Sequence, residues 1–217
     1  MGKEKEIIEE IVTTTVETPQ ESVVYNYCYD DKFQAEDIEN RRLYLNCEID
    51  ENAIDNIVWF IIRYNREDKG IPEDERKPII IYINSPGGNV CDGYGVIDAI
   101  LYSETPVYTV NLAQADSMGL LIYLAGKKRY TMPHSEFLMH DGTTFNYGTS
   151  SKVKDRINFE NQVEEATKQY VLGQTNIDEA TYDEKMRVEW YFLPDEAKKI
   201  GVAHYIIGKD CKLSEIL

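Results

Sequence analysis

Ala-Asp-Ser-Met-Gly, at residues 115–119, is the stretch around which the rest of this chain is organised. It lies between an apolar, strand-like run at residues 107–112 and an apolar, helix-like run at residues 120–126. A serine at a strand-to-helix turn has its hydroxyl beside the helix N-terminus, where free backbone N–H groups and the helix dipole favour negative charge. Such a place suits a nucleophile, but serine at such a turn is most often only a helix N-cap. The stretch alone leaves both interpretations of Ser117 open.

The composition is that of an acidic protein with a sizeable core. The 217 residues include 23 basic and 39 acidic side chains, a formal net charge of −16, and 42% hydrophobic residues. This apolar content is enough for one well-buried domain. A surface with this much negative charge repels nucleic acid and anionic membranes, which argues against a general binder of either. The first residues lack the apolar core of a secretory leader and no run reaches membrane-spanning length, so we expect a cytoplasmic protein.

Few side chains suit a metal site. Cysteine occurs at positions 28, 47, 91 and 211, with no Cys-x-x-Cys pair. We interpret these cysteines as free thiols of a reducing compartment. The three histidines, His134, His140 and His204, form no His-Glu-x-x-His motif. The sequence therefore predicts no metal centre.

Strands and helices alternate from residue 42 to residue 140, which is typical of an α/β fold with right-handed crossovers. The expected strands are residues 42–47, 78–83, 107–112, 128–132, 136–140 and 202–207, and the expected helices are residues 50–64, 90–102, 120–126, 150–172, 178–187 and 195–200. The β-branched run at 78–83 is typical of a central strand buried on both faces. Residues 1–40 are predicted to be a partly flexible N-terminal extension with a strand candidate at 23–29, followed by one domain at 41–217.

Two loops follow neighbouring predicted strands and can act together. Gly87 and Gly88 close the turn after the buried strand, and glycine lets backbone N–H groups approach a ligand because no Cβ blocks the way. Loops at the carboxyl ends of adjacent parallel strands meet at one place. The amides of Gly88 and Met118 can therefore form an oxyanion hole around an acyl carbon that Ser117 attacks.

A general base for this serine is available from a third strand. His140 ends a predicted strand and is followed by Asp141-Gly142, again at a carboxyl end. His134 lies in a turn at the opposite end of that strand, so we expect it to be a surface residue. His204 lies inside the last predicted strand and is expected to be packed or exposed there.

Three motifs occur in a fixed order along the chain: Ile-Asn-Ser-Pro-Gly-Gly at 83–88, the stretch at 115–119, and Met-Pro-His-Ser-Glu-Phe-Leu-Met-His at 132–140. Together they resemble the Clp protease proteolytic subunit (ClpP) family of serine peptidases. Residues 191–201 also resemble the family's segment after its acidic triad member. The likeness runs from about Arg42 to Ile207, in the family's order. It implies the ClpP/crotonase-like fold of repeated ββα units, with a protruding helical handle at about residues 150–175.

The resemblance also implies site residues. Ser117 matches the nucleophile, His140 the general base, and Gly88 and Met118 the oxyanion-hole amides. The acidic member falls on Glu189, where the family has aspartate, and glutamate can orient a histidine in the same way. Asp195 and Asp141 are alternatives whose spacing does not match. Asp116 replaces a small residue before the nucleophile, and its carboxylate points either inward toward His140 or away.

The family's assembly and substrates follow from the same resemblance. It implies a homo-oligomer of stacked heptameric rings that cleaves peptides or unfolded proteins without metal or organic cofactor. Partnership with an AAA+ unfoldase is possible in the family, but its usual N-terminal signature is not visible in residues 20–40. One alternative is a crotonase-type acyl-CoA enzyme, which does not need Ser117 and His140. Another is a catalytically weak or inactive ClpP-like subunit that acts as an assembly partner, which the glutamate at position 189 favours.

Overall fold

The computed structural model describes residues 29–217. By its internal residue contacts, the chain divides into two units, residues 1–36 and residues 37–217. Helix α2 (Tyr29–Glu39) occupies the last part of the predicted N-terminal extension. Tyr29, the last residue of the strand candidate at 23–29, begins this helix, and the rest of that candidate lies outside the described residues.

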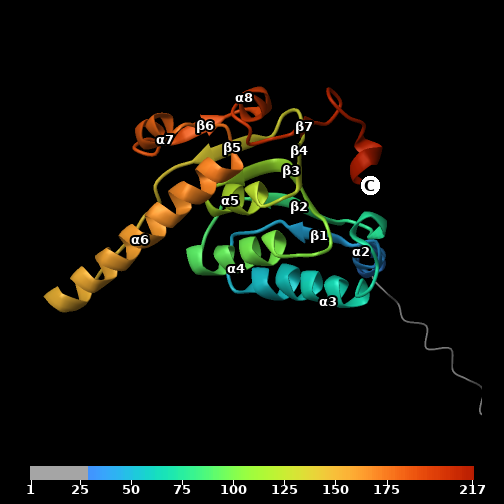
Figure 1. The fold of residues 1–217 in the computed structure, drawn as a ribbon, viewed down its shortest axis with the longest axis horizontal. Coiled ribbons are helices and arrows are strands. Elements are labelled where there is room, and N and C mark those ends of the chain that lie inside the picture. Colours follow the sequence, from blue (N-terminus) through green and yellow to red (C-terminus); the bar gives the residue numbers. More distant parts are fainter. Residues whose placement is uncertain (1–28) are drawn as a thin grey trace, which may run out of the picture. The chain divides into compact units, whose positions relative to one another are not determined.

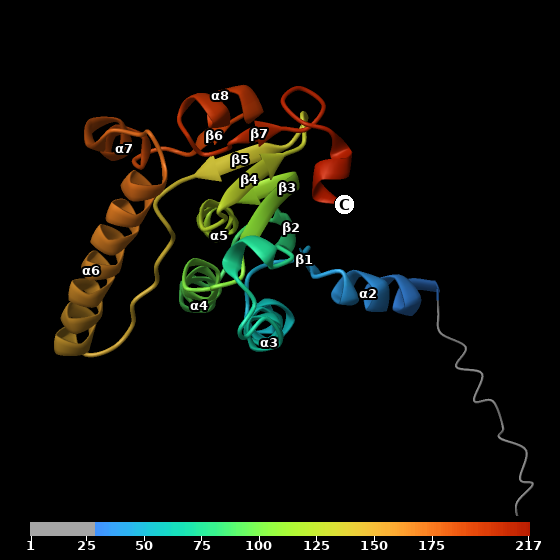
Figure 2. The same cartoon turned by 45° about the vertical axis from the view of Figure 1, so that its right-hand side comes forward.

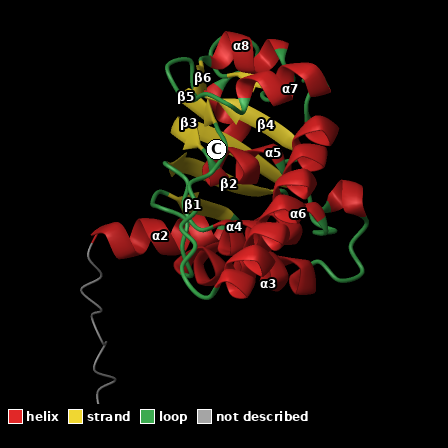
Figure 3. Ribbon diagram, turned by 90° about the vertical axis from the view of Figure 1, so that its left-hand side faces the viewer, coloured by secondary structure: helices red, strands yellow, loops and turns green. Residues whose placement is uncertain are grey.

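A seven-stranded sheet forms the framework of residues 37–217 (Figures 1 and 3). In spatial order, the parallel strands are β1 (Arg42–Leu45), β2 (Ile79–Ser85), β3 (Val107–Asp116), β4 (Lys128–Thr131) and β7 (Tyr205–Ile206). Strand β5 (Glu136–Met139) pairs in parallel with the end of β3, and β6 (Trp190–Phe192) pairs antiparallel with β5. The parallel sheet with intervening helices confirms the expected α/β class.

Helices cover one face of this sheet. They are α3 (Trp59–Glu67), which follows the π-helical turn η1 (Ile54–Val58), and α4 (Val90–Leu101), α5 (Met118–Leu124), α6 (Ser150–Gln174), α7 (Glu179–Lys185) and α8 (Pro194–Lys199). Two short 3-10 turns complete the elements, η2 (Glu73–Glu75) and η3 (Leu213–Ile216), and η3 lies over the opposite face. Figure 2 shows α3, α4 and α5 along one face of the strands. Helix α6 extends well beyond the sheet (Figure 1), and Val171 is its one fully buried residue.

The central strand β2 separates two apolar cores. Ile79, Ile81 and Ile83 are fully buried in the main core between the sheet and the helices. On the opposite face, Ile80 and Tyr82 belong to a smaller core that the C-terminal segment covers. Burial on both faces confirms the expectation drawn from the β-branched run.

The structure also corrects some predicted boundaries. Strand β3 continues to Asp116, so Ser117 follows it directly. The last strand comprises only residues 205–206 rather than 202–207, because Val202 and Ala203 instead donate their N–H groups to the carbonyl of Ala197 in α8. Strand β6 was not expected from the sequence, since its three residues are too few to show a period.

The core predicts a clear stability difference between two isoleucines. Ile81→Ala should lower the free energy of unfolding by about 2–5 kcal/mol, because Ile81 is fully buried and truncation leaves a cavity. Ile71→Ala, at an exposed loop position, should change it by less than about 0.5 kcal/mol. Urea unfolding followed by tryptophan fluorescence measures both. Equal losses for the two variants would contradict this assignment of the core.

Candidate active site

Ser117 has an unusual backbone and an unusual partner. It lies between β3 and α5 with φ 52° and ψ −122°, a conformation that costs a residue with a Cβ about 1–3 kcal/mol and that recurs at functional sites. Its hydroxyl makes no capping hydrogen bond to α5. Instead, Ser117 Oγ lies 2.8 Å from Nε2 of His140. The hydroxyl therefore does not serve as an N-cap, and its contact with an imidazole nitrogen is the geometry of a serine activated by a base.

Strand β5 brings His140 to the serine. The backbone N–H of Ser117 donates to the carbonyl of Leu138 at 2.9 Å, and Asp116 pairs with Leu138 in the sheet register. His140 comes directly after the end of β5 and is half-buried. Since both residues follow the ends of two paired parallel strands, the pairing itself sets their distance.

The glycine turn lies against the serine turn, as the sequence predicts. A Cβ built on Gly87 would lie 2.7 Å from the Cβ of Ser117, which is too close for any other residue. Gly88 has φ 144°, and a Cβ there would lie 2.4 Å from the carbonyl oxygen of Ile49. In the described part of the chain, the backbone N–H groups of Gly88 and Met118 donate to no protein acceptor. Both groups are free to bind an oxyanion, although their role stays a prediction.

Glu189 lies opposite His140 in the strand register. Met139 pairs with Trp190 across β5 and β6, so the next pair along this register is His140 and Glu189. Neighbours across an antiparallel pair share one face of the sheet. The Glu189 side chain is nevertheless exposed, and its Oε2 accepts a hydrogen bond of 3.3 Å from the hydroxyl of Tyr191. No hydrogen bond or ion pair among residues 29–217 joins it to His140, so its role as the orienting acid stays a prediction.

The alternative acids and histidines have other surroundings. Asp195 forms an ion pair with Lys209, and the side chain of Asp141 is exposed. His134 is exposed in its turn, as predicted. His204 lies just before β7, where burial and then the charge of Arg129 lower its pKa to about 4. None of the four side chains forms a hydrogen bond or ion pair with Ser117 or His140 in the structure that spans residues 29–217.

Asp116 is buried beside the nucleophile. The residue is 7% exposed, and its Oδ1 has no hydrogen-bond partner. Burial, followed by the charge of Glu136, raises the pKa of Asp116 to about 6. No hydrogen bond or ion pair connects this carboxylate to His140 within the described residues. Glu136 and Tyr191 are the neighbours that the sequence analysis missed. The alternation of faces along β5 was the signal that could have found Glu136, whereas β6 is too short to show a period.

Metal-ligand clusters and membrane helices were also sought in the structure. Among the described residues, no group of three or more His, Cys, Asp or Glu side chains could hold a metal ion. None of the described helices combines the length and apolarity needed to cross a bilayer. Cys47, Cys91 and Cys211 are free thiols, as predicted, and Cys28 lies outside the described residues.

The model of the Clp protease family matches residues 28–210. This chain belongs to the Clp protease family. It is 32% identical over 119 residues to ATP-dependent Clp protease proteolytic subunit 2 of Thermobifida fusca (strain YX), which covers 54% of this chain and 56% of that protein. It is 28% identical over 184 residues to ATP-dependent Clp protease proteolytic subunit 1 of Frankia casuarinae (strain DSM 45818 / CECT 9043 / HFP020203 / CcI3), which covers 82% of each.

The family match confirms two expectations from the sequence. One is the resemblance to the ClpP family, which residues 83–88, 115–119 and 132–140 carried. The other is the fold class, since the sheet and helices described above are those of a mixed α/β protein of this family.

The buried carboxylate of Asp116 predicts a pH-dependent stability. Its pKa in the folded state is raised from 3.8 to about 6, so folding favours the protonated form. This contribution to stability is fully present below about pH 4 and is lost as the pH rises through about 6, which amounts to about 2 kcal/mol between pH 4 and pH 8. Asp116→Asn cannot titrate and should flatten this part of the pH profile. Urea unfolding at a series of pH values measures it.

Asp74→Asn is the matched control, because it removes one carboxylate from the exposed turn η2. It should leave the slope of stability between pH 4 and pH 8 as in the unsubstituted protein. If Asp116→Asn kept that slope as well, Asp116 would not be the group that titrates.

Proposed function

We propose that this protein is a serine endopeptidase of the ClpP type, which hydrolyses peptide bonds of unfolded proteins or peptides inside an oligomeric chamber. The observation that carries the proposal is the 2.8 Å contact between Ser117 Oγ and His140 Nε2 at a strained strand-to-helix turn. The chain's membership of the Clp protease family supports the same chemistry. A cytoplasmic location is part of this proposal.

The proposed reaction needs no metal or organic cofactor. Ser117 Oγ attacks the scissile carbonyl carbon while His140 Nε2 takes the hydroxyl proton. The oxyanion that forms faces the N–H groups of Gly88 and Met118, both of which lack a protein acceptor. His140 then gives the proton to the leaving amine, and a water molecule, activated by the same imidazole, hydrolyses the acyl-enzyme.

Glu189 is the proposed orienting acid. Its register position opposite His140 supports this role, because cross-strand neighbours on one face are within reach of each other. Tyr191 binds only Oε2 of the carboxylate, so Oε1 remains available for Nδ1–H of His140 after rotation of the glutamate side chain. Glutamate is one methylene group longer than aspartate, so its side chain has to rotate for a carboxylate oxygen to meet the imidazole.

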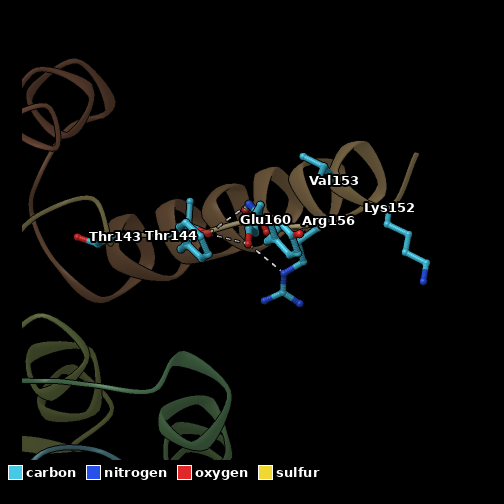
Figure 4. A pocket seen from close by; sticks show the side chains of 9 residues that line it. Thr143, Thr144, Lys152, Val153, Arg156 and Glu160 are labelled. Atoms are coloured by element: carbon cyan, nitrogen blue, oxygen red, sulfur yellow. Dashed lines mark hydrogen bonds and ion pairs between the residues drawn. The ribbon is translucent and has the colours of Figure 1, made fainter. Parts of the chain in front are cut away.

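The arm made by α6 and residues 141–149 supports assembly with further copies. Glu160 accepts hydrogen bonds from Thr144, Asn146 and Arg156, which fastens the segment after His140 onto the helix (Figure 4). Phe145 and Tyr147 on this segment are 89% and 93% exposed. A hollow of about 550 Å³ lies between residues 143–147 and α6.

Large exposed aromatic side chains are typical of a surface that packs against a partner. We therefore propose a homo-oligomer of stacked heptameric rings in which these arms meet. Since both relatives are named ATP-dependent, an AAA+ unfoldase is the proposed partner that would deliver substrates.

One observation favours the second candidate function. The Glu189 side chain is exposed and forms no hydrogen bond with His140, as expected of a catalytically weak or inactive ClpP-like subunit that acts as an assembly partner. A crotonase-type acyl-CoA enzyme is less well supported, because such an enzyme does not need the contact between Ser117 and His140.

Labelling with a fluorophosphonate probe tests the proposed nucleophile. The assembled protein should gain the mass of one probe per chain, and Ser117→Ala should gain none, because the probe reacts with activated serine hydroxyls. His140→Ala should label far more slowly, since its base is gone. Intact mass spectrometry provides the readout. Absence of labelling in the assembled protein would favour the inactive subunit.

Replacement of Glu189 tests the proposed third member. Glu189→Gln should lower kcat for a small peptide substrate by about 10²–10⁴, because glutamine cannot stabilise the imidazolium that forms. Asp195→Asn is the control, since Asp195 pairs with Lys209 and should leave kcat as it is. Unchanged activity of Glu189→Gln would remove Glu189 from the proposed triad.

A further inference from the structure

Carboxylates gather beside Ser117 on one face of the sheet. Asp116 on β3 pairs with Leu138 on β5, and Leu138 pairs with Tyr191 on β6, so the three side chains form one row. Residues two apart on a strand point to the same side. Glu136 therefore shares this face with Leu138, and Glu189 shares it with Tyr191.

Within residues 29–217, no cation forms an ion pair with these acids. The acids are Asp116, Glu136, Glu189 and Asp141. The pKa of Tyr191 is raised first by the charge of Glu189, then by burial and by its hydrogen bond to Glu189, and further by the charges of Asp116 and Glu136. The field over this face is negative.

Asp116 gives this face a feature that a solvated acidic surface lacks. The residue is more than nine-tenths buried, and although the backbone of Leu138 hydrogen-bonds to its carboxyl group, Oδ1 has no partner. Buried polar atoms are nearly always paired, and an ionised carboxylate without a partner is costly to bury. A cationic donor is the group that relieves this cost most effectively, because charge-assisted hydrogen bonds are the strong ones.

We propose that this face is a subsite for a basic side chain of the peptide substrate, with Asp116 as the residue that determines the specificity. The inference rests on the proposed peptidase function. Asp116 directly precedes Ser117, so a side chain near the scissile bond is within reach of it. The apolar stem of a lysine or arginine would pack along Leu138 and the ring of Tyr191, while its charged end meets Asp116 and Glu136. The net charge of −16 would attract such substrates from a distance.

A lysine scan of a neutral peptide tests this subsite. One lysine is moved through the positions on either side of the cleaved bond, and each peptide is compared with its acetyl-lysine counterpart, which keeps the stem and removes the charge. At one position, kcat/KM should be about tenfold or more higher for lysine, and the preference should shrink at high salt. Mass spectrometry identifies the cleaved bond.

Two variants show whether Asp116 causes the preference. Asp116→Asn should bring the ratio of lysine to acetyl-lysine close to one, and Glu136→Gln should lower it partly. Asp74→Asn, which makes the same change of net charge in the turn η2, should keep the full ratio. A ratio near one in the unsubstituted protein, or an unchanged ratio in Asp116→Asn, would overturn the proposal. A change of oligomeric state in Asp116→Asn without a change of the ratio would instead assign the face to a basic side chain of a second copy.

The probe labelling of Ser117 separates failure of the subsite from failure of the peptidase function. If the serine labels but no lysine preference exists, the subsite alone is wrong. If the serine does not label, fluorescently labelled versions of the same peptides can be bound to Ser117→Ala, and anisotropy still compares the affinities for lysine and acetyl-lysine. Equal affinities there would overturn the subsite as well.

Discussion

The pairing of the last residues of β3 with β5 is the constraint on which the site depends. Strand β3 pairs with β4 over residues 108–111 and with β5 over residues 114–116. Between these stretches, Leu112 and Ala113 are exposed, and the register with β2 also shifts. The change of partner lets β3 run past the end of β4 and places β5 beside the serine turn.

Because this pairing ends in the hydrogen bond from Ser117 N–H to the carbonyl of Leu138, it fixes the turn and the histidine together. Asn111, fully buried, donates from Nδ2 to the carbonyl of Glu136 and secures the other end of β5. The strain at Ser117 is therefore held by the sheet on one side and by α5 on the other.

Much of this arrangement could be predicted from the sequence, because its signals are local. The β-branched run of β2, the glycines at 87 and 88, and the boundaries of α4 each follow from residue types over a short window. The choice between N-cap and nucleophile for Ser117 could not be made in this way. It depends on a histidine 23 residues further along the chain, whose position is set by strand pairing.

The position of Glu189, by contrast, could not be predicted from local sequence signals. Strand β6 has three residues, and it is a strand only because it pairs with β5, so its own sequence carries no period. Family resemblance supplied Glu189, while the register explains why that position can reach His140. The Glu189 rotamer that places Oε2 beside the hydroxyl of Tyr191 is not specified by any sequence pattern.

The two departures of this site from the family pattern lie on a common face, but they differ in their effect on its charge. The aspartate in place of a small residue at position 116 adds a buried negative charge beside the nucleophile. The glutamate at 189 replaces an aspartate, so it keeps the charge and moves it outward by one methylene group. The added charge is therefore that of Asp116 alone, and a cation supplied by the substrate would offset it while the peptide is bound. For this reason the proposed preference for a basic side chain is assigned to position 116 rather than to the acid that would orient the histidine.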